Sequence, residues 1–366
     1  MEVCQPDVED SGAMNIAITG VGGGTGQAVI RALRRAALPC RFLGLDANPW
    51  SAGLYQCDAR GLIPRVTDEE RYLVALEGLI VQHKIDALFP CLDVELPAVS
   101  RAEDRFRALG CRPIVSSPDF IRIARDKLVT YRVLSSRNVP FARTMTLADF
   151  RRSCTPASFP VIVKPKSGAG SVGVTVLLEC ADLECYRPDS DDGDIVQEYL
   201  VPASWGVKTP SPHDLMKRGR LRQDEEFKLN GVIAPDGSIA GVFISVTGMN
   251  AGTTFRICPT KDPELLKFSH RVLSVLAEMG AAGPCQLQGR ITKEGPVFYE
   301  LNPRCTASTA ARAGMGFNDC EAALRLFVLG EELTSVAPRL SYSTDTVCLR
   351  YVTEHLVPRA DVERLL

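Results

Sequence analysis

Several patterns that define common protein classes are scarce or absent from this sequence of 366 residues. Only four histidines occur, and none approaches the H-E-x-x-H spacing of a zinc hydrolase. No apolar run reaches the ~18 residues that a membrane-spanning helix needs. Lysine and arginine total 42 against 44 aspartates and glutamates, so the net charge of −2 lacks the basic excess typical of nucleic-acid-binding proteins. We therefore expect neither a membrane nor a nucleic acid as partner.

The cysteine spacing excludes two common motifs and indicates the redox environment of the protein. Thirteen are present, scattered from Cys4 to Cys348, but no C-x-x-C pair occurs, which excludes a zinc ribbon and a thioredoxin motif. Scattered thiols in a chain of this size are typical of a reducing compartment, so we predict a cytoplasmic protein. Residues 1–13 are acidic and polar, lack the order of a secretion signal, and are interpreted as a flexible tail.

What is present indicates a globular protein of several domains. Hydrophobic residues make up 45% and charged residues 23%, a composition that can bury a core. Strands and helices alternate over residues 14–117, which predicts a parallel, Rossmann-like α/β domain. Its expected strands are 14–19, 41–46, 86–90 and 112–115, and its expected helices are 27–37, 69–82 and 94–109.

A second pattern, rich in paired strands, follows over residues 118–330. The turn Pro235-Asp236-Gly237 joins two strands and favours an antiparallel sheet. Residues 118–200 are predicted to form a central and lid subdomain, residues 225–330 a C-terminal subdomain and residues 331–366 an extension. The expected elements are strands at 161–163, 174–178, 194–200, 227–233, 239–246, 286–291 and 297–301, helices at 262–279 and 319–329, and a further strand within 349–357.

Residues 201–224 lack any periodic pattern and contain three prolines and five basic side chains. We interpret them as a mobile insertion. It is either a solvated linker or a lid over an anionic ligand.

A glycine turn after the first strand allows two interpretations. Thr19–Gly26 has the T-G-x-x-G-x-x-G spacing of dinucleotide-binding turns, and Asp46 ends the second strand where a ribose ligand would lie. A tight connection between a strand and a helix needs glycine in any case. The Tyr-x-x-x-Lys pair expected of a short-chain dehydrogenase is missing, so the structural interpretation is favoured.

A second glycine-rich segment, FPVIVKPKSGAGSVGV at 159–174, brings Lys164 before a loop of glycines and serines. Such a loop lets backbone N–H groups approach phosphates, and a lysine supplies a mobile positive charge. The Walker pattern is absent, so a glycine hairpin with solvated lysines remains the alternative. The later strand DIVQEYL, residues 194–200, is able to offer backbone groups to an adenine, although an ordinary strand has the same pattern.

Polar residues at the ends of two neighbouring strands predict a metal site. Glu300 and Asn302 are two residues apart and leave the same face of a strand, and Gln288 precedes them on the strand before. Carboxylate and amide oxygens are ligands that Mg²⁺ or Mn²⁺ takes beside nucleotide phosphates. Arg304 adds a cation suited to a phosphoryl group in transfer.

In this order, VKPKSGAGSVGV, VQEYL and ELNPR resemble the ATP-grasp superfamily, in particular the carbamoyl-phosphate synthetase large chain and carboxylate–amine ligases. The resemblance covers about residues 14–330. It implies an ATP-grasp fold with α/β and α+β parts, in which the first glycine turn belongs to a nucleotide-free N-terminal domain. It also implies ATP and Mg²⁺ (or Mn²⁺) as cofactors, and it allows a homodimer.

The resemblance also implies roles for individual residues. Lys127, Lys164 and Arg304 are the expected catalytic cations, and Gln288, Glu300 and Asn302 the metal ligands. Glu226, with Glu225 as its alternative, is expected on the ribose, and Arg304, Arg312 and Arg256 on the substrate. The residues expected to bind nucleotide are Lys127, Lys164, Ser167, Gly168, Gly170, Ser171, Gly173, Gln197, Glu198, Tyr199, Leu200 and Glu226.

The implied activity is the ATP-dependent joining of a small carboxylate, such as an amino acid, to an amine through an acyl phosphate, with release of ADP and phosphate. Cys305-Thr306-Ala307 stands where the family commonly has Phe-Ser-Gly after the N-P-R motif. Cys305 is therefore a candidate pocket residue rather than a nucleophile, since no histidine lies near it in sequence. An NAD(P)-dependent oxidoreductase and a catalytically idle ATP-binding module remain the alternative functions.

Overall fold

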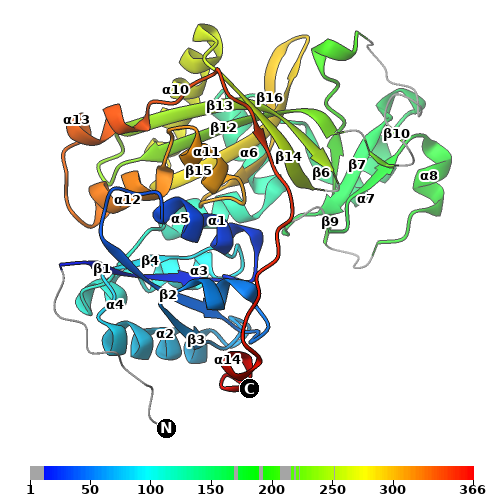
Figure 1. Ribbon diagram of the computed structural model, residues 1–366. Coiled ribbons are helices and arrows are strands. Elements are labelled where there is room, and N and C mark those ends of the chain that lie inside the picture. Colours follow the sequence, from blue (N-terminus) through cyan, green and yellow to red (C-terminus); the bar gives the residue numbers. More distant parts are fainter. Residues whose placement is uncertain are drawn as a thin grey trace.

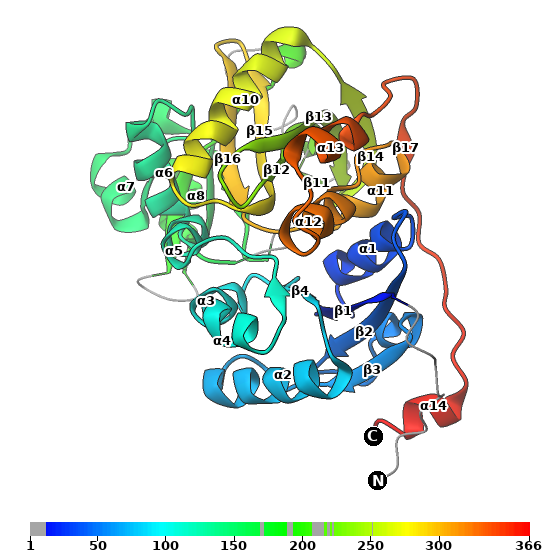
Figure 2. The ribbon, with the colours of Figure 1, turned by 90° about the vertical axis from the view of Figure 1, so that its left-hand side faces the viewer.

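The computed structural model describes residues 12–168, 172–188, 193–206, 216–217, 220–221, 223–250 and 252–366. Figures 1 and 2 show an N-terminal α/β domain, a large sheet with helices stacked against it, and a small domain that projects from one side. None of the helices in these ranges is both long and apolar enough to cross a membrane. Every cysteine within them is a free thiol.

The N-terminal domain is built on a parallel sheet of five strands in the order β3-β2-β1-β4-β5. The parallel α/β prediction is confirmed, with one strand, β3, that the sequence pattern did not indicate. The expected helix 94–109 is two helices, α3 and α4, which meet at Ala102. The elements are β1 Met14–Thr19, α1 Gly24–Leu33, β2 Cys40–Asp46, η1 Ala52–Gln56, β3 Ala59–Leu62, α2 Glu69–His83, β4 Ala87–Phe89, α3 Leu96–Arg101, α4 Glu103–Ala108 and β5 Arg112–Pro113.

The projecting domain holds an antiparallel sheet of four strands in the order β6-β9-β7-β8. Its core is a separate hydrophobic cluster around Phe150, Phe159 and Val163. The elements that lead to and form it are α5 Pro118–Arg125, α6 Lys127–Ser136, β6 Thr144–Thr146, α7 Leu147–Ser153, η2 Pro156–Ser158, β7 Val161–Pro165, β8 Thr175–Leu177, α8 Cys180–Cys185 and β9 Asp194–Glu198.

The largest sheet is antiparallel, with its six strands in the order β16-β15-β12-β13-β14-β17. Phe227 and Leu229 of β12 pack with Val272 and Leu276 of α10 in one hydrophobic core. Because strand residues alternate between faces, Glu226 and Lys228 point to the opposite side. The strands are β12 Gln223–Ile233, β13 Ile239–Asn250, β14 Thr253–Thr260, β15 Gly283–Thr292, β16 Gly295–Asn302 and β17 Cys348–Leu349, and the helices are α10 Pro263–Glu278, α11 Thr309–Gly314, α12 Asp319–Phe327, α13 Leu333–Val336, η4 Ala337–Leu340 and α14 Arg359–Glu363.

Two further features of this region differ from the sequence-based expectations. Strand β14 was not expected. The strand expected within 349–357 is wrong except at Leu349, because β17 ends there and residues 350–357 form no strand. Of the predicted insertion 201–224, the structure describes residues 201–206 with η3 Ala203–Trp205, the paired strands β10 Met216–Lys217 and β11 Arg220–Leu221, and the start of β12. Residues 207–215, 218–219 and 222 lie outside the described residues.

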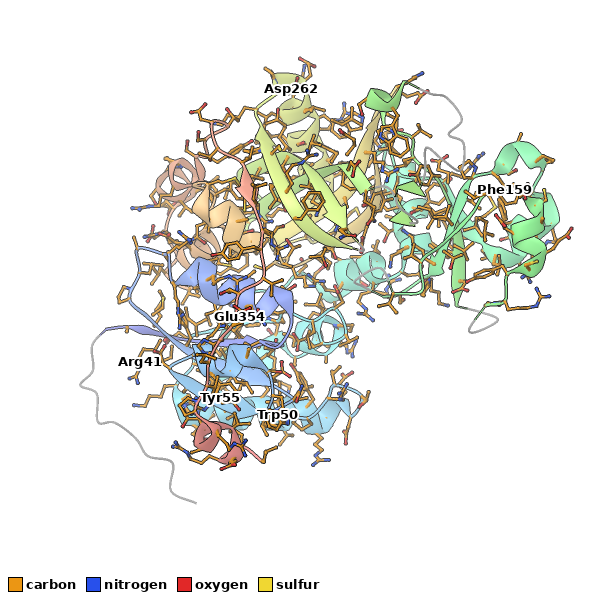
Figure 3. All side chains as sticks on the ribbon, turned by 45° about the vertical axis from the view of Figure 1, so that its right-hand side comes forward. Arg41, Trp50, Tyr55, Phe159, Asp262 and Glu354 are labelled. Atoms are coloured by element: carbon orange, nitrogen blue, oxygen red, sulfur yellow. The ribbon has the colours of Figure 1, made fainter. Side chains whose placement is uncertain are left out.

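The last segment of the chain connects the two large parts of the molecule. It leaves β17 beside β14 and runs down to α14 at the N-terminal domain (Figure 1). His355 lies 3.3 Å from the carbonyl oxygen of Tyr55, and Figure 3 shows Glu354 of the same segment beside Tyr55. Asp361 of α14 approaches Arg60 of β3 at 3.9 Å.

Candidate active site

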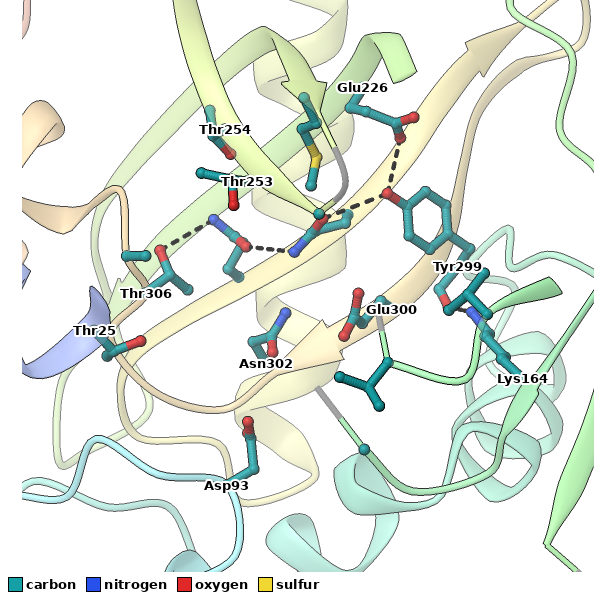
Figure 4. Close-up of a pocket in the computed structure, with 18 of the residues that line it drawn as sticks. Thr25, Asp93, Lys164, Glu226, Thr253, Thr254, Tyr299, Glu300, Asn302 and Thr306 are labelled. Atoms are coloured by element: carbon teal, nitrogen blue, oxygen red, sulfur yellow. Dashed lines mark hydrogen bonds between the residues drawn. The ribbon is translucent and has the colours of Figure 1, made fainter. Parts of the chain in front are cut away.

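A cavity of about 720 Å³ opens where the N-terminal domain, the four-stranded sheet and the six-stranded sheet meet. Its floor is the face of β12, β15 and β16 that α10 does not cover, and Figure 4 shows the polar side chains that line it. Most residues predicted to bind nucleotide or metal converge here. They are Lys127, Lys164, Ser167, Gly168, Gln197, Glu198, Leu200, Glu226, Gln288, Glu300, Asn302 and Arg304.

Lys164 lies at the side of the cavity formed by β7. Its ammonium donates to Oε1 of Gln197 at 2.7 Å, and Gln197 in turn donates to Oγ1 of Thr144 at 2.9 Å. Burial lowers the pKa of Lys164 to about 8, although the nearby Glu300 carboxylate opposes this shift. The side chain is therefore a buried cation beside an open cavity.

Lys127 and the glycine loop lie next to each other. The Lys127 ammonium donates to the carbonyl oxygen of Gly168 at 3.1 Å, and Ser167 donates to the carbonyl oxygen of Arg125 at 3.1 Å. Helix α6 begins at Lys127 because Asp126 caps it and accepts from the N–H groups of Leu128 and Val129. Gly170 and Ser171, the other predicted loop ligands, lie outside the described residues.

The predicted adenine hinge follows β9 along the edge of the cavity. The Glu198 carboxylate accepts from the N–H of Arg143 at 2.8 Å, so this side chain joins β9 to the chain before β6. The carbonyl oxygen of Leu200 accepts from Nη1 of Arg290 at 2.7 Å. Tyr199 lies outside the cavity lining and stacks beneath the Arg290 guanidinium, whose centre is 4.8 Å from the ring.

Glu226, the predicted ribose ligand, is held by a buried ion pair. Its Oε1 accepts from Nε and Nη2 of Arg290 at 3.1 and 2.7 Å, and its Oε2 accepts from the Tyr299 hydroxyl at 2.8 Å. The side chain is 1% exposed. Burial and the adjacent Glu226 carboxylate raise the pKa of Tyr299 well above its usual range, so the tyrosine remains a neutral donor.

The three predicted metal ligands are brought together by strand pairing. Gln288 of β15 lies opposite Glu300 of β16 in the register, and Asn302 follows two residues later on the same face. The side chains of Glu300 and Asn302 make no hydrogen bond or ion pair with the rest of the described chain, and both line the cavity. Gln288 Nε2 donates to Oε1 of Gln286 at 3.1 Å, and Gln286 Nε2 donates to Oγ1 of Thr306 at 3.3 Å.

Arg304 joins the two large domains at the cavity. Its guanidinium pairs with the Asp93 carboxylate through Nε at 3.0 Å and through Nη2, and Nη1 donates to the carbonyl oxygen of Cys305 at 2.8 Å. Burial lowers the pKa of Arg304, but Asp93, Cys91 and Glu300 together outweigh burial and raise it, so the arginine stays charged. Cys305 itself is buried behind the site, with its Sγ 3.6 Å from that of Cys320.

The first glycine turn borders the cavity through Gly20, Gly23 and Gly24. The Asp46 carboxylate, which a dinucleotide site would use for ribose, accepts from the N–H groups of Gly22 at 2.7 Å and Asn48 at 3.0 Å. Its oxygens therefore brace the turn itself. This geometry favours the structural interpretation of the glycines.

Two arginines predicted to bind substrate lie outside the cavity lining. Arg312 is 2% exposed, pairs with Asp319 and donates to Thr309 at 2.7 Å. Arg256 donates to the carbonyl oxygen of Asp224 at 3.0 Å. Gly173 also lies outside the lining.

Other residues of the cavity were not predicted from the sequence. They include Lys228, Thr254, Arg290 and Arg350. The sequence alone could have placed Lys228 in the site, because it is two residues after Glu226 and shares its strand face. It could not have placed Arg350 there, since only the pairing of β17 with β14 brings that residue to the site.

Residues 16–114 match the family of PylC-like N-terminal domains. The chain is 24% identical over 210 residues to the multifunctional protein pyr-3 of Neurospora crassa, a match that spans 54% of this chain and 10% of the relative. It is 23% identical over 239 residues to the carbamoyl phosphate synthase large chain of Rubrobacter xylanophilus, spanning 63% of this chain and 21% of the relative. Both matches therefore span far less than two thirds of the relative.

Three solved structures share the fold. An N5-carboxyaminoimidazole synthetase of Staphylococcus aureus complexed with ADP has a TM-score of 0.65 at 14% identity, covering 86% of this chain and 77% of that one. An L-amino acid ligase of Bacillus licheniformis has a TM-score of 0.63 at 17% identity, covering 90% and 77%. The biotin carboxylase domain of a Hydrogenobacter thermophilus carboxylase, in complex with MgADP and bicarbonate, has a TM-score of 0.64 at 14% identity, covering 90% and 72%.

Proposed function

This chain has the ATP-grasp fold, as its sequence predicted, and we propose that it is an ATP-dependent carboxylate–amine ligase. It joins a small carboxylate to an amine and releases ADP and phosphate. The similarity to an L-amino acid ligase and to a PylC-like domain supports this branch of chemistry.

One observation carries the proposal. Two lysines, an arginine and a set of oxygen ligands all line one cavity, although helix α6, the four-stranded sheet and the six-stranded sheet contribute them from positions far apart in sequence. Lys127 and Lys164 lie on one side of it, and Glu300, Asn302 and Arg304 on the other. A cavity with cations around a cluster of hard oxygen ligands is suited to a nucleotide triphosphate with its metal.

The residues on β15 and β16 fit a divalent cation. Glu300 and Asn302 present oxygens that no other described residue uses, and Gln288 adds an amide oxygen beside them. These three residues would hold Mg²⁺, which supplies charge neutralisation on the phosphates.

The reaction proceeds in two balanced steps. A carboxylate oxygen of the substrate attacks the γ-phosphorus of ATP, the bond from that phosphorus to the bridging oxygen breaks, and ADP leaves. The amine nitrogen then attacks the acyl carbon, the carbon–oxygen bond to phosphate breaks, and the nitrogen loses a proton to form the amide.

The chain contributes position and charge to these steps. Lys164 and Lys127 bind phosphate oxygens, and Arg304, oriented by Asp93, faces the phosphoryl group in transfer. The N-terminal domain and the two antiparallel sheets enclose the cavity and keep water from the acyl phosphate. Glu226 is already bound by Arg290 and Tyr299, so its pairing with ribose requires sharing of a carboxylate oxygen.

The test is ADP release from MgATP by the purified chain, measured with a panel of amino acids and other carboxylates and with hydroxylamine as the amine. We expect release that depends on one carboxylate, accompanied by a hydroxamate. Glu300→Gln removes the charged metal ligand and is expected to lower ADP release by at least about 1,000-fold.

Glu278→Gln, at the exposed end of α10, is the matched control and is expected to keep full activity. Unchanged activity of Glu300→Gln would show that the metal site is assigned to the wrong residues. Tight MgADP binding without ADP release for any carboxylate would instead favour the idle ATP-binding module.

A further inference from the structure

A second buried lysine lines the cavity, and none of the steps above uses it. Lys228 lies on β12, two residues after Glu226, and its side chain is only 4% exposed. Its ammonium donates to Oγ1 of Thr254 at 2.7 Å, and within the described chain no carboxylate pairs with it. Burial lowers its pKa to about 8, against the influence of Glu226 and Glu300. An ammonium has three donors, so two of them remain for a ligand.

A second cation reaches the same place from the end of the chain. Arg350 follows β17, and its Nη1 donates to the carbonyl oxygen of Thr254 at 2.9 Å. Its backbone N–H donates to the carbonyl oxygen of Phe255 at 2.8 Å, which fixes the segment against β14. In the part of the chain that the structure describes, no carboxylate pairs with Arg350 either. Lys228 and Arg350 thus both hydrogen-bond Thr254 and both line the cavity.

These two cations are separate from those assigned to the nucleotide. In Figure 4, Thr254 lies on the opposite side of the pocket from Lys164, with Asn302 and Glu300 between them. Arg304, the cation assigned to the reacting groups, already has Asp93 as its partner. Two buried or half-buried cations without a carboxylate cost free energy unless an anion joins them.

We propose that Lys228, Thr254 and Arg350 form a subsite for a second carboxylate of the acyl substrate, so that the substrate is a dicarboxylic acid. One carboxylate is phosphorylated beside Glu300, Asn302 and Arg304. The other is held by the ammonium of Lys228, the hydroxyl of Thr254 and the guanidinium of Arg350. This assignment rests on the proposed ligase function and adds the class of its substrate.

The test compares acids with their own amides. ADP release is measured with aspartate, glutamate, succinate and glutarate, and with asparagine, glutamine, succinamate and glutaramate, which have the same shape but one charge fewer. For the wild-type chain we expect kcat/KM to favour the preferred acid over its amide by about 100-fold, because the amide leaves buried cations unpaired. Lys228→Gln and Arg350→Gln are each expected to reduce that ratio to below about 5-fold.

Two controls keep the interpretation specific. MgADP affinity is measured for each variant and is expected to change by less than about 2-fold, which also reports on folding. Lys293→Gln, the same substitution in the exposed turn before β16, is expected to change neither the ratio nor the affinity. Loss of MgADP affinity in both subsite variants would assign the subsite to the nucleotide phosphates and overturn the proposal.

Different results would contradict the dicarboxylate subsite and the ligase function. ADP release with monocarboxylic substrates but with none of the dicarboxylic acids would overturn the subsite and leave the ligase function standing. Equal kcat/KM for acid and amide would have the same meaning. If no carboxylate in the panel causes ADP release, the ligase function is overturned, and this assignment falls with it.

Discussion

At the scale of single residues, the site is defined by charges held away from water. Lys164 is 7% exposed and has one side-chain acceptor, Gln197 Oε1, within 3.0 Å. Desolvation disfavours its charged form, which is why its pKa falls to about 8. A phosphate bound beside it reverses that penalty, since an anion stabilises the ammonium.

The affinity for MgADP is therefore expected to depend on pH. Below pH about 8 the Lys164 ammonium is already protonated in the free protein, so affinity is constant with respect to this group. Above that pH, binding must take up a proton, and affinity is expected to fall by up to about 10-fold per pH unit. Calorimetric titration from pH 7 to 9.5 measures this.

Lys164→Met is the comparison for that titration. It is expected to bind MgADP more weakly at pH 7 and to lose the part of the pH dependence that Lys164 causes. A wild-type profile that stays flat to pH 9.5 would show that the ammonium does not contact the nucleotide.

At the scale of elements, the turn from β1 into α1 is built by backbone contacts that only glycine permits. Gly20 has a positive φ of 58°, and a Cβ on Gly26 would lie 2.7 Å from the carbonyl oxygen of Gly20. The helix start is thereby pressed against the strand end, and the turn borders the cavity.

Gly26→Ala is expected to lower the free energy of unfolding by about 2 kcal/mol, because its new methyl group meets backbone that cannot move aside. Gly78→Ala is the matched control. Gly78 is an exposed residue within α2, and a Cβ added to it meets nothing within 4 Å. Gly78→Ala is expected to raise the free energy of unfolding by about 0.5–1 kcal/mol. Urea denaturation measures both, and equal effects at the two positions would contradict the close approach.

At the scale of the whole molecule, the N-terminal domain and the six-stranded part are joined by a shared core and an ion pair. Ile18 and Ile30 of the first pack with Cys320 and Leu324 of the second in one hydrophobic cluster. Asp93 and Arg304 form the pair at the edge of the cavity, with side chains 19% and 10% exposed.

Asp93→Asn is expected to destabilise the protein by about 2–3 kcal/mol, between the values for exposed and fully buried pairs, because the Arg304 charge loses its partner. Asp119→Asn, which breaks an exposed pair with Arg122 in α5, is expected to cost less than about 0.5 kcal/mol. Urea denaturation of both variants tests this. If Asp93→Asn is as stable as Asp119→Asn, the ion pair does not hold the domains together.

The architecture and much of the candidate site could be predicted from the sequence alone. Its repeating strand and helix patterns indicated the parallel domain, and local motifs at Lys164, Gln197, Glu300 and Asn302 indicated residues that the structure brings to one cavity. This was possible because such motifs are short. A glycine loop or two residues two apart on a strand keep their relation whatever the rest of the chain does.

Which charges meet across long separations in the sequence depends on how the strands and domains pack. Arg304 pairs with Asp93, 211 residues away, and Lys228 and Arg350 meet at Thr254 through strands β12, β14 and β17. The Glu226–Arg290 pair arises in the same way, from the register of β12 and β15. No local pattern encodes such pairs, because the free energy of a buried charge depends on what the whole fold places beside it.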